Sequence, residues 1–317
     1  MGSGRRLNRR TLLGFLMGWP YIAPIARAAV LDGSPPRDLL RGFHRTGRFE
    51  RCYRVDATVL LFGIPLFSKQ GVGGGYAAAE TGQCGADQAA ALQFAAGSWP
   101  ERCRGLNRFG ILQEIQVQHS GGSEAIAYAG LITPSKEDDL DGAKKALRPT
   151  QGEMDVTVAS GSSSEGRMRF RAGNVSIPAQ RDWLALTETI SRVSPPAGTS
   201  SREAPLDGST TFLQAMRRAA LSGGPSFRCA FLHNGKPFVL EARRKPGAPC
   251  EMWGTILTGS AAPRVCAEFR TSYAAGDESG LPVRIEYRPK SYLRLTFTEA
   301  EDSARVSIPT LFSEEVL

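Results

Sequence analysis

Apolar and polar residues alternate with a period of two along much of the chain, which is typical of β-strands that bury one face. Val55, Ala57, Val59 and Leu61 follow this pattern, and "FGIPLFSK" continues it, with Pro65 typical of a bulge or a sheet edge. Four more runs predict strands: "FGILQEIQVQ", "EAIAYAGLI", "MDVTVAS" and "RMRFRAGNVSIP". The first half of the chain is therefore predicted to be rich in strands.

The C-terminal third carries the clearest hairpin patterns. "SFRCAFLHNGKPFVLEARR" contains two alternating runs around Asn234-Gly235, and Asn-Gly is a strong short-range hairpin signal. "LPVRIEYRPKSYLRLTFT" repeats this design around Pro289-Lys290. These runs predict antiparallel strands with one face toward solvent.

Three segments have helical patterns, at 134–149, 181–193 and 209–221. The first begins with Ser135 as a candidate N-cap and ends at Pro149. Because the strands greatly outnumber the helices, we predict a mainly β (α+β) fold. Its expected form is a strongly curved antiparallel sheet or open barrel with about three packed helices.

A segment rich in proline, serine and glycine, residues 195–209, is interpreted as a linker. It separates an N-terminal β-rich lobe, 51–194, from a C-terminal antiparallel β lobe, 210–317, and the two are also compatible with one continuous domain. Residues 29–50 are predicted to form an extended N-terminal segment, and residues 1–28 a signal peptide.

The first 28 residues have a basic head, a short apolar run and small residues at their end. This order is typical of a bacterial secretory signal, with cleavage predicted between Ala28 and Ala29. The apolar run is broken by prolines and is shorter than the ~20 residues of a spanning helix, so no transmembrane anchor is expected after processing. Arg9-Arg10 resembles the twin-arginine export motif, with a general secretion signal as the alternative. We expect a soluble periplasmic protein that uses the export machinery for folded proteins.

Removing this segment changes the charge of the protein. The chain holds 39 basic and 31 acidic residues, and residues 1–28 contain five arginines and no acid, so the mature net charge is 34 − 31 = +3. A nucleic-acid-binding protein would need a basic stripe with interleaved aromatic residues, and the remaining sequence has none. We expect no nucleic-acid partner.

Two glycine-containing segments resemble cofactor motifs only in part. "SKQGVGGGYAAAE" has Tyr76 where a dinucleotide-binding loop needs its third glycine, and the glycines would instead let a strand bend. "EDDLDG" resembles a calcium loop, but Arg148 stands where the bidentate glutamate belongs. We therefore predict no cofactor and no metal.

The six cysteines all lie after the signal peptide, and no two have the C-x-x-C spacing of zinc or redox sites. In an oxidising periplasm an even number favours disulfides. We expect at least one bridge within the C-terminal group, where antiparallel strands bring neighbours close. The candidates are Cys229, Cys250 and Cys266, with Cys52, Cys84 and Cys103 in the N-terminal half.

No catalytic motif stands out in the sequence. The three histidines, His44, His119 and His233, are far apart and none sits in a local metal-binding pair. "ASGSSSEG" has Glu165 in place of the second glycine of a nucleophile elbow. No catalytic residue is predicted, although a hydrolase whose site is assembled from distant residues stays open as an alternative.

"YRVDATVLLFGIPLFSKQGVGGGYAAAE" and "GLPVRIEYRPKSYLRLTF" resemble the two ends of a family of exported bacterial proteins described only as a domain of unknown function. The resemblance covers Arg51–Glu80 and Phe227–Phe297. It implies a β-rich cell-envelope protein and supplies no catalytic residues. The leading hypothesis is a non-enzymatic periplasmic protein that binds an apolar, lipid-like ligand or an envelope partner; the alternative is a periplasmic hydrolase.

Overall fold

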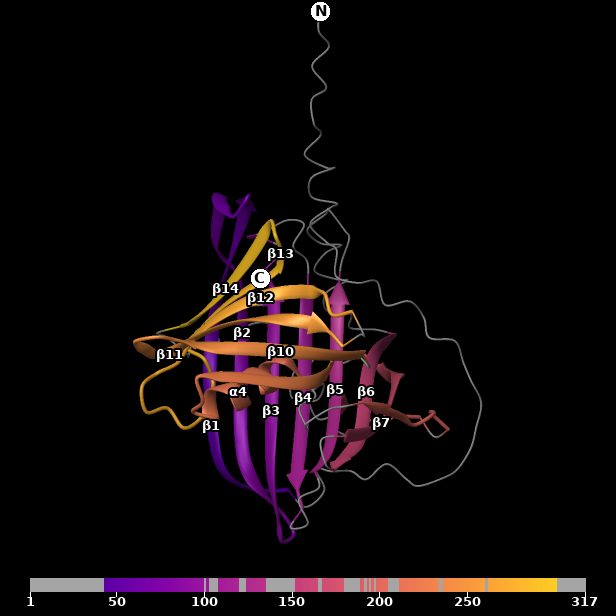
Figure 1. Cartoon of the computed structure of the whole chain (residues 1–317). Coiled ribbons are helices and arrows are strands. Elements are labelled where there is room, and N and C mark those ends of the chain that lie inside the picture. The colour runs from indigo at the N-terminus through magenta and orange to yellow at the C-terminus, as the bar shows by residue number, and fades with distance from the viewer. Residues whose placement is uncertain are drawn as a thin grey trace, which may run out of the picture.

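The computed structural model describes residues 43–99, 101–102, 108–119, 124–134, 152–164, 167–179, 189–190, 193, 195–196, 198–204, 211–233, 236–259 and 262–300. The described chain is mainly β and forms one antiparallel sheet of 14 strands that does not close (Figure 1). The first eight strands are β1 (Phe43–Leu61), β2 (Ile64–Cys84), β3 (Asp87–Ser98), β4 (Arg108–Gln118), β5 (Glu124–Pro134), β6 (Glu153–Ser164), β7 (Arg167–Pro178) and β8 (Arg202–Ala204). Helix α4 (Phe212–Leu221) follows, and then come β9 (Ser226–His233), β10 (Lys236–Lys245), β11 (Ala248–Thr258), β12 (Val265–Ser272), β13 (Arg284–Lys290) and β14 (Leu293–Glu299).

The strand order shows how the two halves of the chain join. Nearly every strand pairs with its neighbours in sequence, and the sheet runs from β8 back to β1 and then from β14 back to β9. The first strand pairs with the last, in a register that places Val55 opposite Phe297 and Val59 opposite Leu293. The segments predicted as two lobes therefore share one hydrogen-bonded sheet, whose edges are β8 and β9. Part of the predicted linker, Arg202–Ala204, is strand β8 and pairs with β7.

The sheet curls so that β9–β12 cross in front of β1–β7 (Figure 1). Three register shifts interrupt the long β1–β2 pair, and such bulges increase the local twist. The glycine-rich segment lies inside β2, where a Cβ on Gly73 would meet the carbonyl oxygen of Gly97 on β3 at 2.1 Å. Gly73 therefore permits the close approach of two backbones inside β2.

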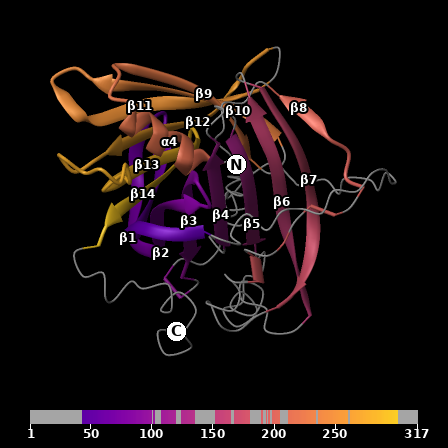
Figure 2. The same cartoon turned by 90° about the horizontal axis from the view of Figure 1, so that it is seen from below.

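Helix α4 lies inside the curve of the sheet, between β9–β12 and the early strands (Figure 2). The predicted helix at 209–221 is thus confirmed, with Thr211 as its N-cap accepting a hydrogen bond from the Gln214 backbone N–H at 3.0 Å. Leu213 and Met216 are buried in a core shared by strands on both sides of the helix. That core includes Tyr53, Ala77, Ala79 and Leu92 from β1–β3, and Cys229, Phe231, Leu240, Ala242, Met252, Ile256, Ala267, Phe269 and Ile285 from β9–β13.

The expectation of about three packed helices is not supported. In the described ranges α4 is the helix with defined bounds, and only Thr189 and Ile190 of the 181–193 segment are helical there. The segment 134–149 lies outside the described residues apart from Pro134, which ends β5. Among those same residues, no helix is long and apolar enough to cross a membrane.

The predicted C-terminal hairpins are present, with one shift. His233 pairs with Lys236 at the end of the β9–β10 hairpin, as the Asn-Gly signal predicts. The second hairpin turns at Ser291-Tyr292, two residues later than Pro289-Lys290. An irregularity in the β13–β14 pairing between Tyr287 and Lys290 accommodates the extra residues.

The predicted disulfide among Cys229, Cys250 and Cys266 is wrong, because all three are free thiols, as are Cys52 and Cys84. Cys250 and Cys266 lie near opposite ends of the β11–β12 pair, and β10 separates β9, which carries Cys229, from β11. A disulfide requires Cα atoms within about 7 Å, whereas each residue along a strand adds about 3.3 Å. Sequence proximity did not bring these thiols together.

Candidate functional site

Side chains of α4 and of the strands on both sides of it pack into one core, and a strip of polar groups lies beside that core. Gln214 on α4 donates to Gln116 on β4 at 3.2 Å, and Gln116 donates to Glu114 at 2.6 Å. Arg217, one helical turn further, is buried and donates to the carbonyl oxygen of Ser279 at 2.6 Å. Burial lowers the pKa of Arg217, and the charge of Glu114 opposes this effect. The strip therefore ties the helix to β4 on one side and to the loop between β12 and β13 on the other.

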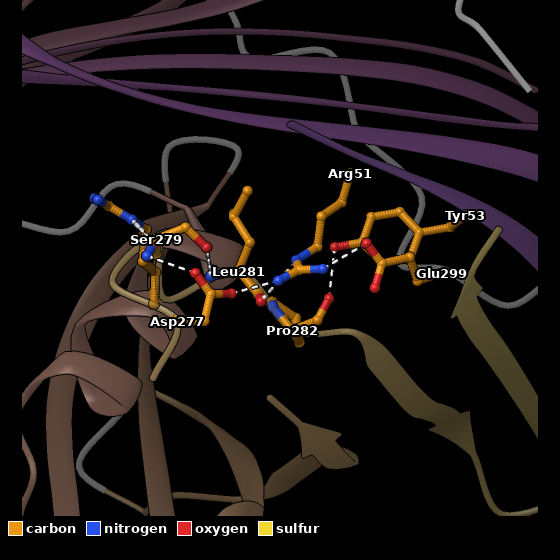
Figure 3. Close-up of polar contacts among 8 residues, drawn as sticks. Arg51, Tyr53, Asp277, Ser279, Leu281, Pro282 and Glu299 are labelled. Atoms are coloured by element: carbon orange, nitrogen blue, oxygen red, sulfur yellow. Dashed lines mark hydrogen bonds and ion pairs between the residues drawn. The ribbon is translucent and has the colours of Figure 1, made fainter. Parts of the chain in front are cut away.

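A second polar cluster ties β1 to the loop between β12 and β13 (Figure 3). Arg51 donates to the carboxylates of Asp277 and Glu299 and, at 3.1 Å, to the carbonyl oxygen of Leu281. Next to it, the Tyr53 hydroxyl donates to the carbonyl oxygen of Pro282 at 2.8 Å. We call Arg51, Asp277 and Glu299 the Arg51 junction.

The charges of the Arg51 junction stabilise one another. Burial alone would raise the pKa of Asp277, but hydrogen bonds from Ser279 and then from Arg51 hold that pKa below its ordinary value. Burial would lower the pKa of Arg51, and the two carboxylates outweigh it and raise that pKa. The Arg51 guanidinium donates to three acceptors, so the junction holds the loop between β12 and β13 against β1.

The loop held by the Arg51 junction packs closely on α4. Gly280 has a φ of +64°, and a Cβ there would lie 2.9 Å from Cγ of Arg217 and 3.0 Å from Cγ of Leu221. Glycine is favoured at position 280 for two reasons: it adopts the left-handed backbone without strain, and it has no Cβ to collide with the helix. The loop connects the helix to β1.

The histidines do not form a catalytic cluster. His119 Nδ1 lies 2.8 Å from Asp87 Oδ2, which is an ion pair or a hydrogen bond with one carboxylate, and both side chains are partly exposed. His233 lies beside Phe238 on β10, where burial lowers its pKa to about 4. Burial and the charge of Asp87 raise the pKa of Cys84, which disfavours a thiolate nucleophile. No group of metal-ligating side chains occurs in the described part of the chain.

The tip of the β1–β2 hairpin is the largest exposed apolar feature of the described residues. Five large apolar side chains there are more than half exposed: Leu61, Phe62, Ile64, Leu66 and Phe67. Figure 1 shows this end of the indigo strands projecting beyond β13 and β14. Strand β3 pairs with β2 only from Gly73 onward, so the tip extends past its neighbour. We call residues 61–67 the hairpin tip.

The backbone of the hairpin tip is unusual. Phe62 and Gly63 have φ of +50° and +83°, so both residues of the two-residue loop are left-handed. Asparagine, aspartate or glycine normally occupies such positions, and a bulky residue there costs about 1 kcal/mol or more. Phe62 is 97% exposed and therefore regains none of that cost by packing within the chain.

A hollow of about 560 Å³ adjoins the hairpin tip on the outer face of β11–β14. Leu60 and Gly63 line it from the hairpin, and the remaining lining residues are Trp253, Gly254, Thr255, Glu268, Phe269, Arg270, Glu286, Arg288 and Arg294. We call this site the arginine hollow.

Several sequence-predicted positions lie outside the described residues: Arg9, Arg10, Ala28, Ala29 and Cys103. The export motif, the cleavage site and the periplasmic location therefore stay predictions. Sequence reasoning missed the hairpin tip because "FGIPLFSK" was interpreted as a continuation of the period-two strand pattern, with Pro65 at a bulge or a sheet edge. The available signal was its lack of alternation, since apolar residues on both faces of a strand need cover from both sides.

No family model matches the chain, and no curated protein matches it either. A solved structure of a β-barrel-like protein of domain of unknown function DUF1849 from Brucella abortus is similar, with a TM-score of 0.38 and 6% identity. The match covers 79% of this chain and 94% of that chain. A likeness at this level carries no functional argument, and the expected family membership stays a prediction.

Proposed function

We propose that this protein is a non-enzymatic cell-envelope protein that docks on a membrane surface through the hairpin tip. The single observation that carries the proposal is the exposure of five large apolar side chains on one projecting hairpin. Exposed apolar patches of this kind mark interaction sites. The strained backbone at Phe62 supports the same conclusion, because strain that packing does not repay is typical of functional positions.

The shape of the hairpin tip fits a bilayer better than a protein surface. About three residue pairs lie beyond Val59, which at ~3.3 Å per residue corresponds to ~10 Å of projection. Amphipathic elements that bind membranes bury their apolar face by ~5–10 Å in the headgroup region. Lys69 is exposed on β2 at the base of the tip. When the tip enters the bilayer, its ammonium group would lie at the depth of the anionic headgroups.

The packed core around α4 favours docking over the carriage of an apolar ligand. The walls on both sides of the helix contribute to one continuous core, and the helix itself occupies the space between them. Likewise, the single His119–Asp87 contact offers one carboxylate where a hydrolase site would need a cluster.

Vesicle flotation tests the proposal with protein purified from the periplasm, its N-terminus checked by mass spectrometry. The wild type should float with vesicles of phosphatidylcholine and phosphatidylglycerol. The double variant Phe62→Ser/Ile64→Ser loses apolar burial of about 1.5 kcal/mol or more per side chain, so its affinity should fall about a hundredfold. Val265→Ser removes an exposed apolar side chain from β12, which is separated from β1 by β13 and β14 in the sheet, and serves as the matched control.

Two results would overturn the proposal. One is a wild-type protein that does not float with any vesicle, and the other is a tip variant that floats as well as Val265→Ser. Sedimentation analysis adds a further check. If the wild type self-associates and Phe62→Ser/Ile64→Ser does not, the tip forms a contact between two copies of the chain and the membrane proposal is overturned. Phe62→Ser/Ile64→Ser and Val265→Ser should both unfold at the wild-type temperature, since the replaced side chains are exposed.

A further inference from the structure

The arginine hollow lies where a lipid headgroup would be when the hairpin tip enters a bilayer. Leu60 and Gly63 belong to the hairpin and line the hollow, so the apolar tip and the charged hollow are continuous. The Leu60 N–H donates to the carbonyl oxygen of Tyr292 at 2.8 Å, which fixes the hairpin against the β13–β14 turn. The spacing between tip and hollow is therefore set by the backbone.

The register of β11–β14 brings the charged residues together. Arg270 on β12 lies opposite Trp253 on β11 and opposite Glu286 on β13, while Glu268 lies opposite Arg288. All of these residues point to the outer face, because the alternate residues of β12, such as Phe269, are buried in the core. The outer face of this half-sheet thus gathers arginines from three neighbouring strands.

Arginines outnumber carboxylates in this cluster. Arg288 donates to Glu268 at 3.1 Å, and Glu286 accepts from Arg284 at 2.8 Å and lies 3.8 Å from Arg294. Among the lining residues, two carboxylates thus face three arginines, Arg270, Arg288 and Arg294, so the hollow carries a net positive charge.

Two of these guanidinium groups have unused donors. The Nε atoms of Arg288 and Arg294 are buried and have no hydrogen-bond acceptor among the described residues. A buried donor without an acceptor costs about 1–3 kcal/mol, and a phosphate oxygen would satisfy it. The planar fork of arginine matches the geometry of phosphate in particular.

We propose that the arginine hollow binds the phosphate of an anionic lipid headgroup whose acyl chains lie beside the hairpin tip. The inference rests on the proposed membrane function and adds a specific headgroup site to it. Trp253 is partly exposed on the lining, as is typical of aromatic residues at the level of headgroups. Glu268 and Glu286 accept hydrogen bonds, so a headgroup that also carries hydroxyl groups, such as phosphatidylglycerol, satisfies both kinds of lining residue.

The fluorescence of Trp253 offers a direct readout of the hollow. Short-chain dihexanoyl phosphatidylglycerol, used below its micelle concentration, should change the emission of the wild type and not that of Trp253→Phe. Arg288→Gln/Arg294→Gln should weaken this binding at least tenfold. The charge-matched control Arg228→Gln/Arg167→Gln replaces exposed arginines on β9 and β7 and should change it less than twofold.

The same variants separate the headgroup site from the membrane function. If Arg288→Gln/Arg294→Gln binds short-chain lipid as the wild type does, the headgroup site is wrong while tip-dependent flotation stands. If Phe62→Ser/Ile64→Ser no longer floats but still gives the Trp253 response, the headgroup site is supported independently. If inorganic phosphate alone gives the response and competes with the lipid at equal concentration, the ligand is free phosphate and the lipid assignment is overturned.

Discussion

Replacing Arg51 by methionine removes three hydrogen bonds that join β1 to β14 and to the loop between β12 and β13. The side chain is only 13% exposed, so water cannot fully replace its contacts. Methionine keeps most of the apolar stem, and the expected effect therefore comes from the lost charge and hydrogen bonds. The loop that these bonds hold also packs on α4. Loss of the bonds should therefore also weaken the packing of this loop on the helix.

The magnitude follows from what remains after the substitution. Removing one partner of a fully buried ion pair typically costs about 3–5 kcal/mol, which is the upper bound for this partly exposed junction. Asp277 still accepts a hydrogen bond from the Ser279 N–H at 2.8 Å, and Glu299 is 39% exposed and can be hydrated. We therefore expect a loss of about 2–3 kcal/mol, or a fall in Tm of about 3–5 °C for a chain of this size.

Urea unfolding followed by circular dichroism measures this loss at pH 7. Arg228→Met is the matched control, because Arg228 pairs with Glu241 at 3.2 Å between two exposed side chains. Exposed pairs contribute about 0–1 kcal/mol, so the control should stay within about 0.5 kcal/mol of the wild type. The reasoning is refuted if Arg51→Met and Arg228→Met destabilise the protein equally.

A pH series adds a second check on the Arg51 junction. The folded pKa of Asp277 is below its ordinary value of 3.8, so its stabilisation is present above that pH and is lost as the pH falls through the folded pKa. Arg51→Met has less of this stabilisation to lose. The difference between variant and wild type should therefore narrow below about pH 4, and a constant difference would show that Asp277 is not the partner that matters.

Two further predictions concern the strands that face α4. Burial lowers the pKa of His233 from 6.5 to about 4, so the folded state binds fewer protons than the unfolded state. Stability should fall as the pH drops from 6.5 toward 4, and His233→Phe should flatten this part of the urea-derived profile. Gly254→Ala would place a Cβ 1.9 Å from the carbonyl oxygen of Glu241 and 2.7 Å from Cζ of Phe269, with an expected loss of about 1–3 kcal/mol. Gly75→Ala meets its nearest atom at 3.4 Å and should unfold like the wild type; equal effects of the two substitutions would contradict the packing shown here.

Local patterns determined the elements that depend on local physics. The period-two alternation predicted the mainly β fold, and the Asn234-Gly235 turn correctly located the β9–β10 hairpin, because turn geometry depends on the turn residues themselves. The helix at 209–221 was also predicted, because its helical pattern is a feature of the local sequence. The interpretation of the glycine-rich segment as a requirement of the backbone is confirmed at Gly73, although its partner strand was not known from the sequence.

The tertiary structure alone decided which distant groups meet. Nothing in the sequence pairs β1 with β14, and that pairing brings Arg51 to Glu299 and places the hairpin tip beside the arginine hollow. The disulfide prediction failed for the same reason, because cysteines that are close in sequence were placed on different strands and at opposite ends of one pair. Alternation shows which face of a strand is buried, whereas the neighbour across the sheet is set by the free energy of the whole fold.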